Sequence, residues 1–202
     1  HLSIRRQRQM CIRDSKLAQF LVAVERREKR EPLQHITGIA PFRHLELEVG
    51  PGVFIPRPET EQVVDLAIQK TKHVPAPLVV DLCAGSGAIA ISIGTEVSSA
   101  TVYAVELSDQ AFEYLSRNYQ NYGLDPKTLR QENLKTALRE LDGTVDLVVS
   151  NPPYIPDAAV PIDLEVQLHD PSLALYGGED GLDVIREIST RALALLLSLI
   201  HI

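Results

Sequence analysis

Short apolar runs alternate with amphipathic stretches over residues 60–195, and this alternation restricts the possible folds more than any other feature. The predicted strands are residues 78–82, 101–106, 128–131 and 145–150. The predicted helices begin near Thr60, Ala88, Ser108 and Asp183, with Thr60 and Ser108 as helix caps. Strands that alternate with helices predict an α/β fold with a mainly parallel sheet and helices on both faces.

The residues before this region predict a helix followed by a hairpin. Apolar side chains recur at helical spacing over residues 17–24, and a charged run then leads to Pro32, which stops the helix. Residues 45–49 alternate between apolar and acidic side chains, which is typical of a strand. A Gly-Pro-Gly turn follows, and residues 53–55 are the expected partner strand. Residues 32–58 are therefore predicted to form a β-hairpin linker.

The two ends of the chain differ from the rest in character. Residues 1–15 and 197–202 resemble translated sequencing-adapter reads, so we interpret both as non-native segments and set them aside. We expect the natural protein to continue beyond both ends, which would leave the sheet incomplete at its C-terminal side. The predicted division is then a remnant N-terminal helix at 16–31, the linker at 32–58 and the main domain at 59–196.

Composition excludes several classes of protein. The 20 basic and 27 acidic residues give a net charge of −7, which argues against non-specific binding to nucleic acid or to a membrane surface. Two cysteines cannot build a disulfide scaffold, and the six histidines are not spaced as metal ligands, so no metal site is predicted. No signal peptide or membrane span is recognised, which predicts a cytoplasmic protein.

A glycine-rich turn after the first predicted strand indicates a nucleotide-type site. Gly85 and Gly87 permit a tight turn and a close backbone approach to a ligand, in front of a helix N-terminus. Glu106 ends the next strand and can accept two hydrogen bonds from a ribose diol. Asp81 precedes the turn and suits a cationic amino-acid group, directly or through water. The same residues also fit a dinucleotide fingerprint, so the nucleotide stays open at this point.

The tetrapeptide Asn151-Pro152-Pro153-Tyr154 follows the last predicted strand and indicates the reaction. Two prolines remove backbone donors, which leaves an edge that mainly accepts hydrogen bonds through the side chain of Asn151 and the carbonyl of Pro152. A planar NH₂ group presents two donors that match this edge, and Tyr154 can stack on its plane. Holding both hydrogens favours localisation of the nitrogen lone pair and aims it at a methyl donor.

Four segments together resemble one enzyme family, the peptide-chain release factor glutamine methyltransferases of the HemK/PrmC type. These segments are residues 32–61 with the string IPRPETE, 81–91 with DLCAGSGAIAI, 151–156 with NPPYIP, and 169–188. The resemblance implies a Rossmann-like class I methyltransferase fold that uses S-adenosyl-L-methionine. It implies methylation of the glutamine amide in the Gly-Gly-Gln loop of release factors. The helix at 16–31 would be the remnant of a helical substrate-docking domain.

The resemblance also implies a set of site residues. Donor contacts are expected from Asp81, Cys83, Ala84, Gly85, Ser86, Gly87, Glu106, Asn133 and Asn151. The glutamine pocket is expected from Asn151, Pro152, Pro153 and Tyr154, beside a lid of Pro56, Arg57, Pro58 and Glu59. The expected partner is a release factor, with no membrane or direct nucleic-acid substrate, and the protein is expected to be a monomer.

Four other functions are compatible with parts of this pattern. The same chemistry could serve a glutamine of a ribosomal protein, or the amino group of adenine or guanine in nucleic acid. The glycine turn alone would fit a nicotinamide-dependent oxidoreductase, although that enzyme would have no use for residues 151–154. The chain could also bind the donor without transferring a methyl group.

Overall fold

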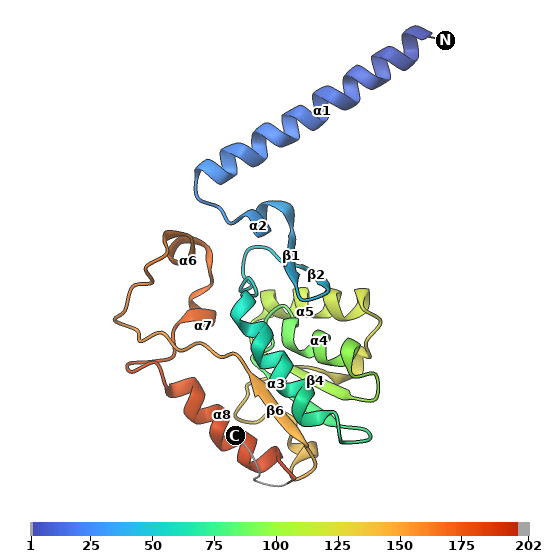
Figure 1. The fold of residues 1–202 in the computed structure, drawn as a ribbon. Helices are drawn as coiled ribbons and strands as arrows, with labels where there is room; N and C mark the ends of the chain where they lie inside the picture. Colours follow the sequence, from blue (N-terminus) through green and yellow to red (C-terminus); the bar gives the residue numbers. More distant parts are fainter. Residues whose placement is uncertain (1, 198–202) are drawn as a thin grey trace.

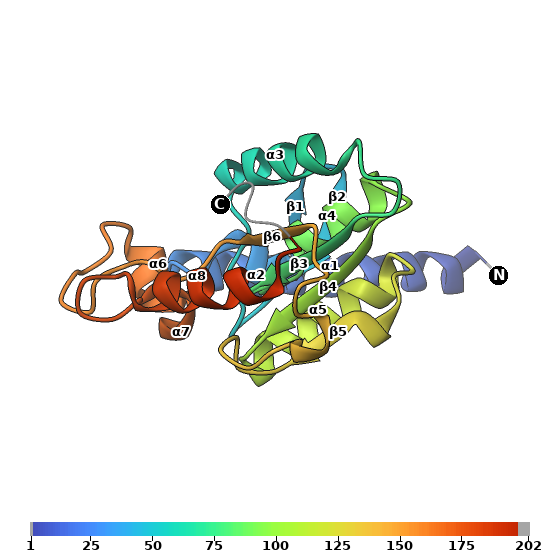
Figure 2. The same cartoon turned by 90° about the horizontal axis from the view of Figure 1, so that it is seen from below.

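The computed structural model describes residues 2–197, with side chains described from residue 15 onward. Its central feature is a four-stranded parallel sheet (Figure 1), in which the strands lie in the order β5-β4-β3-β6 (Figure 2). The strands are β3 Leu78–Leu82, β4 Thr101–Glu106, β5 Leu129–Gln131 and β6 Leu147–Ser150. All four lie within or at the predicted positions, and the predicted α/β class is confirmed.

Helices cover both faces of the sheet because successive strand residues point to opposite sides. On one face of β3, Val79 packs with side chains of three helices, α3 Glu61–Thr71, α4 Ala88–Glu96 and α5 Asp109–Asn121. On the other face, its neighbour Val80 packs with Leu195 of α8. Helix α8 spans Asp183–Leu195 and runs beside β6 (Figure 2). Both predicted caps can be checked: the hydroxyl of Ser108 accepts from the N–H of Ala111, whereas Thr60 makes no side-chain cap.

The linker contains a hairpin, but its strands are not the predicted pair. Strand β2 Leu45–Glu48 pairs antiparallel with β1 Ile39–Phe42, which precedes it. Residues 53–55 form no strand, so that part of the prediction is wrong. The side chains of Val53 and Ile55 are still buried, because they pack against Ala111 of α5. The hairpin side chains Phe42, Leu45 and Leu47 belong to the main core cluster, so the linker is part of the core.

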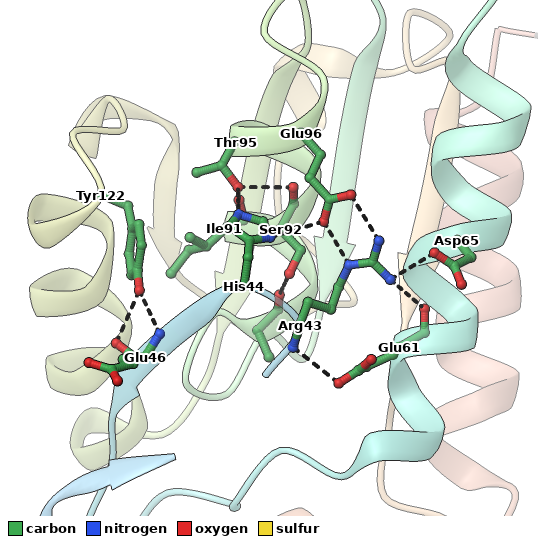
Figure 3. A network of polar contacts seen from close by, with 11 residues as sticks. Arg43, His44, Glu46, Glu61, Asp65, Ile91, Ser92, Thr95, Glu96 and Tyr122 are labelled. Atoms are coloured by element: carbon green, nitrogen blue, oxygen red, sulfur yellow. Dashed lines mark hydrogen bonds and ion pairs between the residues drawn. The ribbon is translucent and has the colours of Figure 1, made fainter. Parts of the chain in front are cut away.

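Arg43, at the hairpin turn, fastens the hairpin to two helices (Figure 3). Its backbone N–H donates to Glu61 of α3 at 3.0 Å, and its guanidinium donates to Glu96 of α4 at 2.6 and 2.8 Å and to Asp65 at 2.7 Å. The Arg43 guanidinium holds the pKa of Glu96 below its usual range. Paired carboxylates on two helices thus fix the hairpin, and with it the segment that leads from the hairpin to α3.

Asn118 of α5 is fully buried and joins the hairpin to the glycine turn. Its amide nitrogen donates to the carbonyls of Glu48 at 3.0 Å and Ser86 at 2.9 Å, and its amide oxygen accepts from the N–H of Glu48 at 2.8 Å. One side chain therefore satisfies three backbone groups from two segments. Such a network specifies the positions of both segments, because each group would otherwise be unpaired.

Replacing Asn118 by Ala should therefore destabilise the fold. Three backbone groups lose their partner, and we expect the free energy of unfolding to fall by about 3 kcal/mol. Asn118→Asp keeps an accepting oxygen but removes both N–H donors, so its free energy of unfolding should also fall. Urea unfolding followed by circular dichroism measures both. A change below about 0.5 kcal/mol for Asn118→Ala would contradict this assignment.

The N-terminal part is helical. Helix α1 Leu2–Glu28 extends away from the sheet domain (Figure 1), and α2 Leu33–Thr37 connects it to the hairpin. The helix predicted at 16–31 is therefore the C-terminal part of α1, which ends at Glu28, three residues before the predicted end. Residues 1 and 198–202 of the segments interpreted as non-native lie outside the described residues. Among residues 2–197, no helix has both the length and the apolar character that crossing a bilayer requires.

Short helical turns connect the remaining elements. They are η1 Pro58–Thr60, η2 Pro126–Thr128, η3 Arg139–Leu141, α6 Leu164–His169 and α7 Ser172–Leu175. Neither α6 nor α7 was predicted from the sequence. Both are short and begin next to a carboxylate or a proline, which gives little periodicity to detect.

Candidate functional site

A cavity of about 480 Å³ lies where the strands β3, β4 and β6 end. Its walls are the glycine turn after β3, the end of β4, the segment after β6, the linker segment before α3 and residues 171–176. In open parallel sheets, ligands bind outside the carboxyl ends of the strands, where this cavity is found.

Most of the predicted site residues line this one cavity. From the predicted donor site they are Cys83, Ala84, Gly85, Ser86, Glu106, Asn133 and Asn151. From the predicted glutamine pocket and lid they are Asn151, Pro152, Pro153, Tyr154, Pro56, Arg57 and Glu59. Three predicted residues do not line it: Asp81, Gly87 and Pro58. The two motif groups, far apart in sequence, therefore face a common space.

Gly85 and Gly87 each have a positive φ, but the space around the two residues differs. Gly85 has φ +57, and a Cβ built on it would meet nothing within 4 Å, so its backbone borders open space. Gly87 has φ +89 at the start of α4, where a Cβ would come within 2.8 Å of side-chain atoms of Ile91 and Leu115. The first glycine thus exposes the backbone to the cavity, and the second permits helix α4 to pack against α5.

Glu106 is buried at the end of β4 and holds the turn together. One carboxylate oxygen accepts from the N–H of Leu107 and Ser108, each at 2.8 Å, and the other accepts from Gly85 at 2.8 Å. A carboxylate has about four acceptor positions, so capacity remains on the oxygen that meets Gly85. The residue is therefore a fixed acceptor at the cavity wall, as a ribose hydroxyl would require.

Asp81 lies behind the turn and is fully buried. One carboxyl oxygen accepts from the N–H of Ala90 at 3.1 Å, and the other has no partner among the described residues. Burial raises the pKa of Asp81 to about 8, the N–H of Ala90 opposes this, and the charge of Glu106 adds to it. The side chain is therefore mainly protonated at neutral pH, and the structure does not bring it to the cavity wall.

This raised pKa predicts how stability depends on pH. The native state binds a proton at Asp81 that the unfolded chain releases near its ordinary pKa of 3.8. The stabilisation is complete below that pKa and disappears as pH rises through about 8. In this window the free energy of unfolding should fall by up to ~1.4 kcal/mol per pH unit relative to Asp81→Asn. Parallel urea titrations at pH 5 to 9 measure the difference; equal slopes for both proteins would contradict it.

Cys83 and Asn133 line the cavity without acting as reactive groups. Cys83 has the left-handed φ of +66, and burial raises the pKa of its thiol to about 12, so it stays neutral. The side-chain oxygen of Asn133 accepts from the N–H of Lys135 at 3.0 Å, which forms a local turn at the cavity edge. A contact between Asn133 and the donor stays a prediction.

Asn151 and Tyr154 present polar and aromatic surface to the cavity. The amide nitrogen of Asn151 donates to the hydroxyl of Thr60 at 3.3 Å. Its amide oxygen accepts no hydrogen bond from the described residues, so an acceptor is available. Tyr154 is 64% exposed and can cover a planar ligand.

A loop after α7 holds the Pro-Pro-Tyr segment from behind. Ile155 donates to the carbonyl of Leu175 at 2.8 Å and accepts from Gly177 at 2.9 Å. A Cβ on Gly177 would lie 2.8 Å from the carbonyl oxygen of Pro153, and one on Gly181 would overlap that of Tyr154. Only glycine allows the loop this close, so these positions fix the backbone of the segment.

Arg57 of the predicted lid is bonded to the turn between α6 and α7. Arg57 donates to Asp170 at 2.9 Å and lies over the ring of Phe54, 5.0 Å from its centroid. The Asp170 side chain is almost fully buried; burial raises its pKa, and the charge of Arg57 acts in the opposite direction. The ion pair therefore fixes the linker segment relative to the turn between α6 and α7.

Sequence reasoning missed several residues of this site. Thr60 was read only as a helix cap, and Asp170, Gly177 and Gly181 were included in a resembling segment without a role. Asn118 carried no signal at all, because a single amide in an amphipathic helix looks like ordinary surface. A glycine pair after a short helix is a turn signal, but it does not say which backbone it will contact.

Comparison with known proteins agrees with this geometry. The family model described as the methyltransferase small domain matches residues 46–169, more than half of the chain. The PrmC N-terminal domain matches residues 2–38, a range that includes most of the first segment interpreted as non-native. In fold, the chain is similar to the catalytic domain of hMettl16, solved with the MAT2A 3′UTR hairpin 6. That likeness has a TM-score of 0.55 and 17% identity, and covers 75% of this chain and 58% of that one.

Curated relatives are much closer in sequence. The release factor glutamine methyltransferase of Streptomyces coelicolor is 54% identical over 89% of this chain and 64% of its own length. The 4-amino-L-phenylalanine/4-methylamino-L-phenylalanine methyltransferase of Streptomyces pristinaespiralis is 41% identical over 92% of this chain and 64% of its own length. The chain thus spans less than two thirds of either relative. It belongs to the methyltransferase small domain family, within the HemK/PrmC type.

Proposed function

We propose that this chain transfers a methyl group from S-adenosyl-L-methionine to the side-chain amide nitrogen of the glutamine in the Gly-Gly-Gln loop of release factors. The observation that carries the proposal is that one cavity joins a nucleotide-type wall to the Asn151–Tyr154 edge. The similarity to release factor glutamine methyltransferases supports the choice of acceptor.

The donor wall fits S-adenosyl-L-methionine on three observations. Gly85 leaves its backbone open to the cavity, and Glu106 offers a fixed and buried carboxylate. Helix α4 begins directly after Gly87, so its N-terminus follows the turn. When bound, this cofactor supplies an electrophilic methyl group on a sulfonium. Glu106 would hold the ribose diol, and the residues of the turn would contact the rest of the nucleoside.

The acceptor wall fits a planar amide. The oxygen of Asn151 and the carbonyl of Pro152 are acceptors, and an amide NH₂ has two hydrogens to donate to them. An amide nitrogen is a poor nucleophile because its lone pair is delocalised. Acceptors that hold both hydrogens would favour a localised lone pair directed at the methyl group. As the C–N bond forms, the C–S bond of the donor would break, S-adenosylhomocysteine would leave, and the amide nitrogen would release one proton. Such positioning can contribute several kcal/mol of the ~7–11 kcal/mol available from orientation.

Other acceptors with an NH₂ group fit the same edge in principle. One relative is named for methylating the amine of an amino-phenylalanine, so a small aromatic amine is a second candidate. The net charge of −7 argues against a base in nucleic acid. Cytoplasmic location and a monomeric state stay predictions.

The test is transfer of labelled methyl from S-adenosyl-L-methionine to a purified release factor. Matched acceptors are the same release factor with its loop glutamine changed to alanine, 4-amino-L-phenylalanine, and an adenine-rich oligonucleotide. We expect label only on the release factor that retains glutamine. Equal label on the alanine form, or label confined to either other acceptor, would contradict the proposed substrate.

A further inference from the structure

Thr60 belongs to the linker string IPRPETE and contacts Asn151 of the segment 151–154, and its hydroxyl does not cap a helix. It occupies the residue before α3, but its side chain makes no capping hydrogen bond there. The residue is 9% exposed, lines the cavity, and accepts from the amide nitrogen of Asn151 at 3.3 Å. A nearly buried hydroxyl needs a partner, and Asn151 is the one that the structure gives it.

The orientation of the Asn151 amide matters because its two ends have opposite chemistry. The oxygen accepts hydrogen bonds and the nitrogen donates two. A half-turn of the amide would point its nitrogen at the acceptor NH₂, so that two donors would face each other. With the nitrogen of Asn151 bonded to Thr60, its oxygen is left for the cavity.

We infer that Thr60 is a positioning residue for methyl transfer: its hydroxyl holds the nitrogen of Asn151 and thereby keeps the oxygen toward the acceptor amide. This inference rests on the proposed function, since it assigns that oxygen to the acceptor. It also gives a physical reason why IPRPETE and NPPY occur in one chain. Residue 60 of the first string contacts residue 151 of the second across 91 positions of sequence.

Two substitutions separate this role from packing. Thr60→Val keeps the shape of the side chain and removes the hydroxyl, and Thr60→Ser keeps the hydroxyl. We expect Thr60→Val to lower kcat by ~10–100-fold, the effect of a misdirected reacting group. Thr60→Ser should stay within about threefold of the wild type. The donor dissociation constant, measured by calorimetry, should change by less than about threefold in both variants.

A second measurement does not depend on activity. In ¹⁵N-labelled protein, the Asn151 side-chain amide is assigned by its disappearance in Asn151→Asp. A hydrogen-bonded amide proton exchanges slowly with solvent, so Thr60→Val should speed exchange of that amide and Thr60→Ser should not.

The outcomes distinguish the positioning role of Thr60 from the proposed methyl transfer itself. Faster amide exchange and a lower kcat in Thr60→Val, both restored by Thr60→Ser, support the inference. Unchanged amide exchange in Thr60→Val overturns it whether or not the protein is active. Unchanged kcat in an active Thr60→Val overturns it as well. A wild type that transfers no methyl to any acceptor, yet shows the exchange difference, counts against the proposed function while leaving the Thr60–Asn151 contact established.

Discussion

Replacing Asn151 by Ala is expected to lower the rate of methyl transfer by at least about 100-fold, because the acceptor loses the oxygen that orients it. The side chain is exposed and makes one hydrogen bond within the described residues, to Thr60. Its removal should therefore change the free energy of unfolding by less than about 0.5 kcal/mol. Single-turnover transfer at saturating donor measures the rate, and urea unfolding checks the fold.

Asn151→Asp is the matched control for this substitution. It keeps an accepting oxygen at the same position but cannot donate to Thr60. We expect it to retain more transfer than Asn151→Ala. If Asn151→Ala transferred methyl at the wild-type rate, residues 151–154 would not act as the acceptor edge, and the mechanism proposed above would fail.

Replacing Glu106 by Ala is expected to weaken binding of S-adenosyl-L-methionine by ~10–10²-fold. The one acceptor position that remains on the carboxylate can take a charge-assisted hydrogen bond from a ribose hydroxyl, which is worth ~1.5–3 kcal/mol. The same change removes the acceptor for three backbone N–H groups, so the turn also loosens. Calorimetry gives the affinity, at a temperature where circular dichroism shows that the variant is folded.

Glu106→Gln separates the two effects. It keeps the shape of the side chain and one accepting oxygen, so we expect a smaller loss of stability but still a clear loss of donor affinity. The same calorimeter can test the oxidoreductase alternative, because that alternative requires the wild type to bind NAD. Donor affinity within about threefold of wild type in Glu106→Ala would rule out the ribose contact.

The sheet was predictable because its signals are local. Residues 78–82 and 101–106 are apolar runs with turn residues at each end, and both are strands. The hairpin was harder. Pro41 lies inside β1 and weakens the strand signal, although proline is tolerated in the edge strand of a two-stranded pair. The run Val53–Ile55 looks like a strand, yet Val53 and Ile55 are buried by packing against α5 and not by strand pairing.

The site was predictable in its motifs and less so in its contacts. Residues 85, 106 and 151 could be named because their chemistry is tied to strand ends. Asp81 shows the limit of this reasoning: its position suggested contact with a cationic group, and that contact stays a prediction, because the structure buries the side chain fully and does not place it on the cavity wall. The partners of Thr60 and Gly181 lie far along the chain, so no local pattern indicates them.

The most direct test of the whole account is to locate the transferred methyl group by fragmentation mass spectrometry. A release factor is incubated with S-adenosyl-L-methionine and this protein, and in parallel with the Asn151→Ala variant. The account predicts one added methyl group on the side-chain amide of the Gly-Gly-Gln glutamine with the wild type and almost none with the variant. A methyl group at any other atom, or the same glutamine methylated equally by both proteins, would contradict it.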